Sequence, residues 1–167
     1  MAAFFPYLVF CQALGALIGA FTAVWSEMMY IRAMRDGRVD TAERAHLDGI
    51  ARSLRFGMTL LLLSSFALVI VDYELRLPLQ PALSPSYWIS ITLALLIIIV
   101  AWALSRRFIT FALGSAVVFT SWWFLVFLTV GQLPVLSFGA AISSLVVVTA
   151  IFYALLEYTR FLVLPKR

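Results

Sequence analysis

Two glutamates stand in long apolar stretches of the chain, and they are the first candidates for chemistry. Glu27 ends an uncharged run, and Glu157 lies in the last apolar run, eight residues after Thr149 and four after Tyr153. Residues four apart share one face of a helix, so a polar stripe leads to Glu157. Ionisable groups inside a membrane are unfavourable and commonly mark ion or proton pathways. We therefore predict that Glu27, Glu157 and Tyr153 bind an ion or relay a proton.

A second interpretation gives both carboxylates a structural role, in which each is neutralised by an arginine. Arg160 follows Glu157 at the i,i+3 spacing, which places both side chains on one helical face. Glu27 has Arg32 on its own helix and Arg55 on the next one as candidate partners. Near the membrane interface such a paired carboxylate is tolerated without a large penalty. The sequence leaves both interpretations open.

His46, the single histidine of the chain, follows Glu43 with the ExxH spacing. Di-metal sites of four-helix bundles use this spacing twice, together with further glutamates. Here it occurs once, so the alternative is a histidine on an exposed amphipathic turn. Because histidine titrates near neutral pH, His46 is also a candidate for a pH-sensitive gate in the ion pathway. The sequence assigns neither a metal nor a cofactor.

Several classes of function lack the residues they need. One histidine cannot supply bis-histidine haem ligation, and one cysteine cannot form a redox-active disulfide within the chain. No Walker A, HExxH or GxSxG motif occurs. We therefore favour a non-enzymatic role without nucleic-acid binding. The expected partners are membrane lipids and other membrane subunits, in a homo-oligomer or a larger complex.

The composition is that of a membrane protein. Hydrophobic residues make up 64% of the chain and charged residues 12%, against about 25% charged in a typical soluble domain. Several uncharged segments have about 20 residues, the length that a helix needs to cross the bilayer core. We predict an all-α polytopic transmembrane bundle of five helices, a single membrane domain over residues 1–167. The expected helices cover about 6–36, 41–72, 85–104, 108–130 and 135–164.

The distribution of basic residues predicts an orientation. Half of the basic residues and five of the eight acidic ones lie between Glu27 and Arg55, where a helical hairpin with its tip at about 30–55 leaves the membrane. The turn at Arg106 and the C-terminal residues are also basic, whereas the loop 73–84 and the turn 131–134 are not. By the positive-inside rule we expect an N-terminus outside and a C-terminus inside.

Small residues on the first helix predict a packing seam. Gln12, Gly15 and Gly19 share one face, and the two glycines form a GxxxG pair that lets a second helix approach closely. In the fourth helix, Trp122 and Trp123 suit contact with lipid, a pigment or a neighbouring subunit. The hairpin arginines are expected to bind lipid headgroups or dock an acidic partner. They are Arg32, Arg35, Arg38, Arg52 and Arg55.

Three consecutive stretches within residues 25–70 resemble the sequence of a known group of proteins. They are the run SEMMYIRAMRDGRV, the acidic residue of TAERAHLDGIARSLR, and GMTLLLLSS at the start of the membrane part of the second helix. Together they resemble the first hairpin of a group of uncharacterised bacterial multipass inner-membrane proteins. In that group an acidic residue follows a small one at the place of Glu27. The resemblance implies a bacterial inner-membrane protein and supplies no activity.

Two hypotheses of function follow. The first is a small ion or solute transport component, in which Glu27 and Glu157 form the polar centre and helices self-associate. The second is a non-catalytic accessory or structural subunit of a larger membrane protein complex. A transporter needs buried polar residues that converge on one path, whereas the glutamates of an accessory subunit would be paired with arginine.

Overall fold

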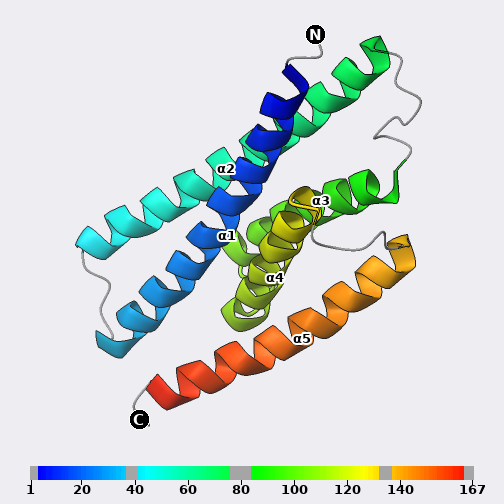
Figure 1. The fold of residues 1–167 in the computed structure, drawn as a ribbon. Coiled ribbons are helices and arrows are strands. Elements are labelled where there is room, and N and C mark those ends of the chain that lie inside the picture. The colour runs from blue at the N-terminus through cyan, green and yellow to red at the C-terminus, as the bar shows by residue number, and fades with distance from the viewer. Residues whose placement is uncertain (1–3, 37–40, 76–83, 132–136, 164–167) are drawn as a thin grey trace.

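The computed structural model describes residues 4–36, 41–75, 84–131 and 137–163, with side chains described over 4–32, 49–75, 84–131 and 137–162. Within these ranges the chain forms five α-helices and no strand, which confirms the predicted fold class (Figure 1). The helices are α1 (Phe5–Asp36), α2 (Thr41–Glu74), α3 (Pro85–Ser105), α4 (Phe111–Thr129) and α5 (Phe138–Val163). Each contains a segment long and apolar enough to cross a membrane, so the protein is built as a multi-pass membrane protein.

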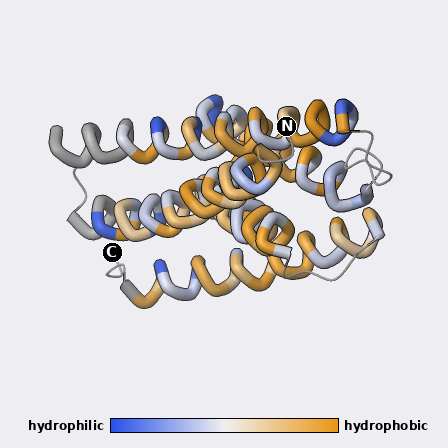
Figure 2. Tube along the Cα trace, turned by 45° about the horizontal axis from the view of Figure 1, so that its top comes forward, coloured by the Kyte–Doolittle hydropathy of each residue, from blue (hydrophilic) through white to orange (hydrophobic). Residues whose placement is uncertain are grey.

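Apolar residues dominate the middle of the helices, and hydrophilic residues lie mostly toward their ends (Figure 2). Hydroxyl side chains inside the bundle bond to their own helices. Ser64, Ser65 and Thr120 each donate to a carbonyl oxygen one turn earlier, at 2.7, 2.7 and 2.8 Å. These bonds satisfy polar groups where no water is present to do so. Ser121 is the exception, because its hydroxyl is buried and has no hydrogen-bond partner among the described residues.

α1 and α2 form an antiparallel pair (Figure 1), and glycines of the two helices face each other. A Cβ atom on Gly15 would lie 2.8 Å from the Gly57 carbonyl oxygen and 2.8 Å from the Leu61 amide nitrogen. A Cβ atom on Gly57 would lie 2.9 Å from the Gly15 carbonyl oxygen. Only hydrogen side chains at both positions allow the two backbones to meet in this way. The GxxxG pattern predicts Gly15 at such a contact and does not reveal its partner, Gly57.

α4 lies at the centre of the bundle and contacts α1, α3 and α5. Its Trp122 is fully buried and packs on Gly19 of α1, where a Cβ atom would overlap the indole ring. Leu125 of α4 is also fully buried, in a cluster that includes Leu61 of α2 and Leu93 of α3. Trp122 therefore lies inside the bundle and away from surrounding lipid.

α5 is the most peripheral helix. Its contacts are mainly with α4, with few to α1 and α3, and it runs along one side of the bundle (Figure 1). In its most apolar 18-residue window 11% of the residues are buried, compared with 44% for α4. Most of the α5 surface is therefore available to lipid or to another protein.

The helix boundaries differ most from the sequence prediction at the starts of α4 and α5. The sequence predicts these starts at about 108 and 135, but α4 begins at Phe111 and α5 at Phe138. At α4 the difference has a local cause. Arg107 has a φ of 59°, and the Phe108 amide donates to the Ala103 carbonyl oxygen at 2.9 Å, so this segment closes α3. Thr110 then caps α4 by accepting from the Leu113 amide at 3.5 Å. The turn thus extends to Thr110, because α3 needs a C-terminal cap before α4 can start.

Candidate functional site

The two intramembrane glutamates meet at one arginine. Arg160 of α5 donates from Nη2 to both carboxylate oxygens of Glu27 on α1, at 3.0 Å to Oε1 and 2.8 Å to Oε2. Both residues are buried, with 6% of Arg160 and 7% of Glu27 exposed. Nη1 of the same guanidinium donates to Oε1 of Glu157 at 3.2 Å. We call Glu27, Arg160, Glu157 and the hydroxyl of Ser115 the ion cluster.

Ser115 brings α4 into the ion cluster. Its hydroxyl oxygen accepts from Arg160 Nη2 at 2.8 Å and donates to the Ala112 carbonyl oxygen at 3.1 Å. The guanidinium therefore links α1, α4 and α5 by direct hydrogen bonds. Hydrogen bonds to a charged group are stronger than neutral ones, more so in surroundings of low dielectric constant. These hydrogen bonds hold the peripheral helix α5 against α1 and α4.

Two aromatic rings form a wall beside the guanidinium. Tyr30 of α1 and Phe111 of α4 stack with their centroids 4.0 Å apart. The central carbon of the guanidinium lies 5.1 Å from the Tyr30 ring centroid and 5.4 Å from that of Phe111. Both distances suit a cation–π interaction. Nε of Arg160 is buried and has no hydrogen-bond partner among the described residues.

The charges of the ion cluster do not cancel. Two carboxylates face one guanidinium, which leaves a formal charge of minus one when all three groups are ionised. Glu27 receives the stronger compensation, since both of its oxygens are bonded to Arg160. Glu157 has 47% of its side chain exposed and shares one bond with the same guanidinium. The excess negative charge therefore lies at Glu157, on the outer side of the cluster.

The structure corrects the partner expected for Glu27. The sequence suggested Arg32 or Arg55, but both are exposed, and the ion pair is made with Arg160. For Glu157, the pairing with Arg160 is the alternative that the sequence reasoning had kept. Arg160 itself, the residue that joins the two glutamates, was missed as their common partner. Its position three residues after Glu157 was a signal for one of the two contacts only.

The hydrogen bonds that form the ion cluster join Glu27, Glu157, Arg160 and Ser115, and Tyr153 takes no part in them. Tyr153 is 39% exposed on α5. Arg52 is exposed on α2. His46 and Arg35 lie in helical segments whose side chains are not described, and Arg38 lies outside the described residues. The predicted gate at His46 therefore stays a prediction.

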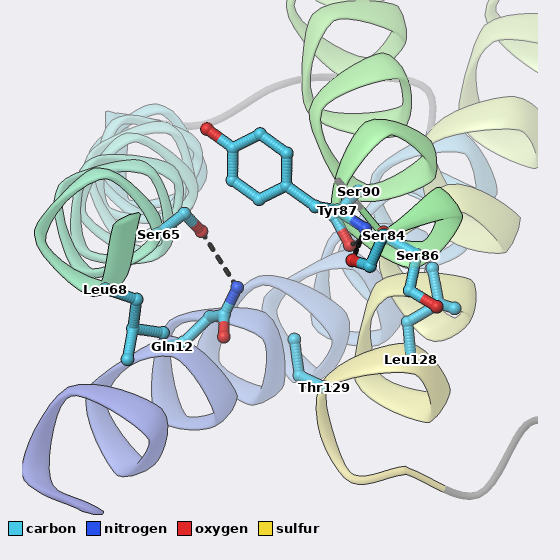
Figure 3. A pocket seen from close by; sticks show the side chains of 9 residues that line it. All are labelled: Gln12, Ser65, Leu68, Ser84, Ser86, Tyr87, Ser90, Leu128 and Thr129. Atoms are coloured by element: carbon cyan, nitrogen blue, oxygen red, sulfur yellow. Dashed lines mark hydrogen bonds between the residues drawn. The ribbon is translucent and has the colours of Figure 1, made fainter. Parts of the chain in front are cut away.

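A small polar pocket lies at the opposite end of the bundle, where α1 begins and α2 ends (Figure 3). Gln12 of α1 points toward α2 and donates from Nε2 to the Ser65 hydroxyl oxygen at 2.9 Å. The pocket has a volume of about 170 Å³ and no charged residue in its lining. Its lining residues are Gln12, Ser65, Leu68, Ser84, Ser86, Tyr87, Ser90, Leu128 and Thr129. The sequence predicts Gln12 only as part of a packing face and does not reveal these hydroxyls, which come from α2, α3 and α4 and from the residue before α3.

Asp72, near the end of α2, is a buried carboxylate that the sequence reasoning did not single out as a site. Only 2% of it is exposed, and its Oδ1 has no hydrogen-bond partner among the described residues. It lies seven residues after Ser65, on the α2 face that also carries Leu68. It therefore stands at the pocket end of the bundle, away from Arg160.

These arrangements limit the chemistry available in the described part of the chain. No group of three or more histidine, cysteine, aspartate or glutamate side chains is placed there to hold a metal ion. Comparison with protein-family models, with curated proteins and with solved structures finds no match to this chain. The function must therefore be argued from the ion cluster, the polar pocket and the exposed surface.

Proposed function

We propose that this chain is a non-catalytic subunit of a larger protein assembly in the bacterial inner membrane. The observation that carries this proposal is the binding of both intramembrane carboxylates to Arg160. A buried ion pair holds its helices in one arrangement, and removing one partner is strongly destabilising. Tyr30 and Phe111 cover the guanidinium. Such a cluster suits a rigid structural element better than a carboxylate that must bind and release a permeant ion.

The surface of α5 supports the same proposal. Large apolar side chains such as Val146 and Ile151 are exposed by 63% and 54%, and Tyr158 by 62%. Exposed polar groups lie on the same helix, including Ser143, Tyr153 and Glu157. Lipid alone would not favour hydroxyl and carboxylate groups on this surface, whereas polar residues can bond across helices in a membrane. We therefore assign the contact with the partner to α5.

The proposed orientation follows from the charged residues. Arg32, Arg55 and the turn residues Arg106 and Arg107 are exposed. The positive-inside rule places them on the cytoplasmic side, where anionic lipids attract arginine. The resemblance of residues 25–70 to bacterial multipass proteins agrees with this membrane. The ion cluster then lies toward the cytoplasmic face and the polar pocket toward the outer face.

Native mass spectrometry of the protein extracted gently from its own membranes tests the proposal. We expect a heteromeric assembly of fixed stoichiometry. Two variants of exposed apolar residues then compare α5 with α1. Ile151→Trp on α5 should weaken the assembly, whereas Phe21→Trp on α1 should not. A homo-oligomer or a monomer under the same extraction would contradict the proposal.

Ion or solute transport is the second candidate, and the uncompensated charge at Glu157 favours it. A protein with one excess carboxylate charge near the polar centre attracts cations. The test is flux of protons or monovalent cations into liposomes that contain the purified chain. Flux above that of empty liposomes, abolished by Glu157→Gln, would support transport. Absence of flux, or flux unchanged in the variant, would remove this candidate.

A further inference from the structure

The polar pocket where α1 begins and α2 ends has a lining suited to a small uncharged molecule. Seven of its nine lining residues have side chains that form hydrogen bonds, and the other two, Leu68 and Leu128, are apolar. None of the nine is charged, and Asp72, four residues after Leu68, is not part of the lining. A charged ligand would leave water without finding a counter-charge here, which is unfavourable. The lining therefore favours a neutral ligand.

The hydrogen bonds already made in the lining decide which groups the ligand needs. Ser65, Ser90 and Thr129 donate to carbonyl oxygens of their own helices, at 2.7, 2.9 and 3.1 Å. Their protons are thus used, and their remaining lone pairs accept hydrogen bonds. Gln12 gives one N–H to Ser65 and keeps its second N–H and its carbonyl oxygen for another partner. A ligand with several hydroxyl groups fits this lining, because each hydroxyl both donates and accepts.

The volume of the pocket sets the size of the ligand. A cavity of about 150 Å³ holds one benzene molecule, which has six non-hydrogen atoms. The polar pocket, with about 170 Å³, therefore admits a molecule of about that size. Glycerol also has six non-hydrogen atoms, and three of them are hydroxyl oxygens. Leu68 and Leu128 offer apolar contact to its carbon atoms.

The depth of the pocket brings it within reach of such a ligand. α3 has 21 residues, a length of about 32 Å that matches the hydrocarbon core of a bilayer. Ser84 caps the start of α3, and Thr129 is the last residue of α4. The pocket therefore lies at the boundary between hydrocarbon and headgroups, where a glycerol group arrives either from water or as the headgroup of a lipid.

A ligand in the pocket would link two helices that have few contacts with each other. Ser65 of α2 lies on one side of the pocket, and Tyr87 and Ser90 of α3 lie on the other (Figure 3). The direct contacts between α2 and α3 are few. Binding should therefore stabilise the fold, which makes thermal unfolding a suitable measurement.

We propose that the polar pocket binds one glycerol group, as free glycerol or as the headgroup of phosphatidylglycerol. Hydroxyls of the glycerol donate to the side-chain oxygens of Gln12, Ser90 and Thr129, and its carbon atoms lie against Leu68 and Leu128. This site does not depend on the proposed role as a subunit, because its whole lining comes from one chain.

The first arm of the test uses free glycerol. The full-length chain is unfolded thermally in phosphatidylcholine nanodiscs over a glycerol titration, next to Gln12→Leu, which removes the amide from the pocket. Exclusion of glycerol from protein surfaces raises the melting temperature of both chains, so the difference between them reports the site. Bound glycerol should raise the melting temperature of the wild-type chain by about 3–6 °C more than that of the variant, at ten times its dissociation constant.

The second arm uses the lipid. The chain is equilibrated in nanodiscs of equimolar phosphatidylglycerol, phosphatidic acid and phosphatidylcholine, then analysed by native mass spectrometry. Phosphatidic acid is anionic but has no glycerol headgroup, so it accounts for lipid held by the arginines at the other end of the bundle. A bound headgroup should enrich phosphatidylglycerol about tenfold over both other lipids, as two hydrogen bonds would give. This enrichment should be absent in Gln12→Leu.

Two serines offer a matched pair of variants. Ser90 in the pocket and Ser143 on the exposed surface of α5 each donate to the carbonyl oxygen four residues earlier, at 2.9 Å. Ser90→Ala should reduce the glycerol-dependent rise or the lipid enrichment, whereas Ser143→Ala should leave both unchanged. A positive result in the first arm alone assigns free glycerol, and one in the second arm assigns the headgroup. Equal responses of the wild-type chain and Gln12→Leu in both arms would show that the pocket holds water only and would overturn the proposal.

Discussion

Arg160 and Glu27 stand 133 residues apart in the chain and form a buried ion pair with a shortest N–O distance of 2.8 Å. The pair joins the last helix to the first one. Because α5 makes few other contacts with α1, this ion pair is a main constraint on where the C-terminal end of α5 lies. A buried charge without its partner is strongly unfavourable, so the two residues should be needed together.

Ser115 should contribute measurably to the ion cluster. Ser115→Ala removes the hydroxyl that accepts from Arg160 Nη2 at 2.8 Å, and we expect it to lower the free energy of unfolding by about 1–2 kcal/mol. Ser143→Ala is the control, since this exposed hydroxyl bonds to the Gly139 carbonyl oxygen of its own helix. Thermal unfolding of both variants in detergent compares them. An equal loss in the two variants would mean that the bond to Arg160 adds nothing.

The glycine contact between α1 and α2 should not tolerate a methyl group. In Gly15→Ala the new Cβ atom would lie 2.8 Å from backbone atoms of Gly57 and Leu61, so we expect destabilisation of about 1–3 kcal/mol. At Gly49 nothing lies within 4 Å of such an atom. Gly49→Ala should therefore be neutral or stabilise by up to about 1 kcal/mol through its helix propensity. Comparable melting temperatures for the two variants would contradict the close approach of α1 and α2.

The orientation can be tested by labelling single cysteines in intact cells. In a Cys11→Ala background, Tyr73→Cys at the outer end of α2 should react with a membrane-impermeant maleimide. Ser105→Cys at the end of α3 should react only after the membrane is permeabilised. Both native residues are exposed, so accessibility within the fold does not differ between them. The opposite labelling pattern would reverse the orientation that the positive-inside rule predicts.

The fold class was predictable because each helix has a local signature. Uncharged runs of about 20 residues set the number of helices, and Ser84 before Pro85 is a local capping signal that the structure uses at the start of α3. The start of α4 was placed too early, because the sequence does not reveal that Arg107 adopts a positive φ to close α3. Local chemistry thus accounts for the helices better than for the turns between them.

The candidate site was predictable only in part. Glu27 and Glu157 stand out because they are charged residues in apolar runs, and the i,i+3 spacing suggests Arg160 as a partner of Glu157. The contact of Arg160 with Glu27 depends on how α5 packs against α1 and α4, which no local pattern reveals. Gly57 was missed for the same reason, since its role appears only when α2 lies against Gly15.

A double-mutant cycle tests whether Glu27 and Arg160 stabilise the protein as a pair. Thermal unfolding in nanodiscs would be measured for Glu27→Gln, Arg160→Gln and the double variant. We expect Arg160→Gln, which leaves the buried Glu27 without a counter-charge, to lower the stability by about 3–5 kcal/mol. Glu27→Gln should cost less, because Arg160 keeps its bond to Glu157. The double variant should lose much less than the sum of the two. A second cycle of Glu27→Gln with Arg106→Gln, an exposed arginine, should be additive. Additive losses in the first cycle as well would show that the two residues act independently and do not form a stabilising pair.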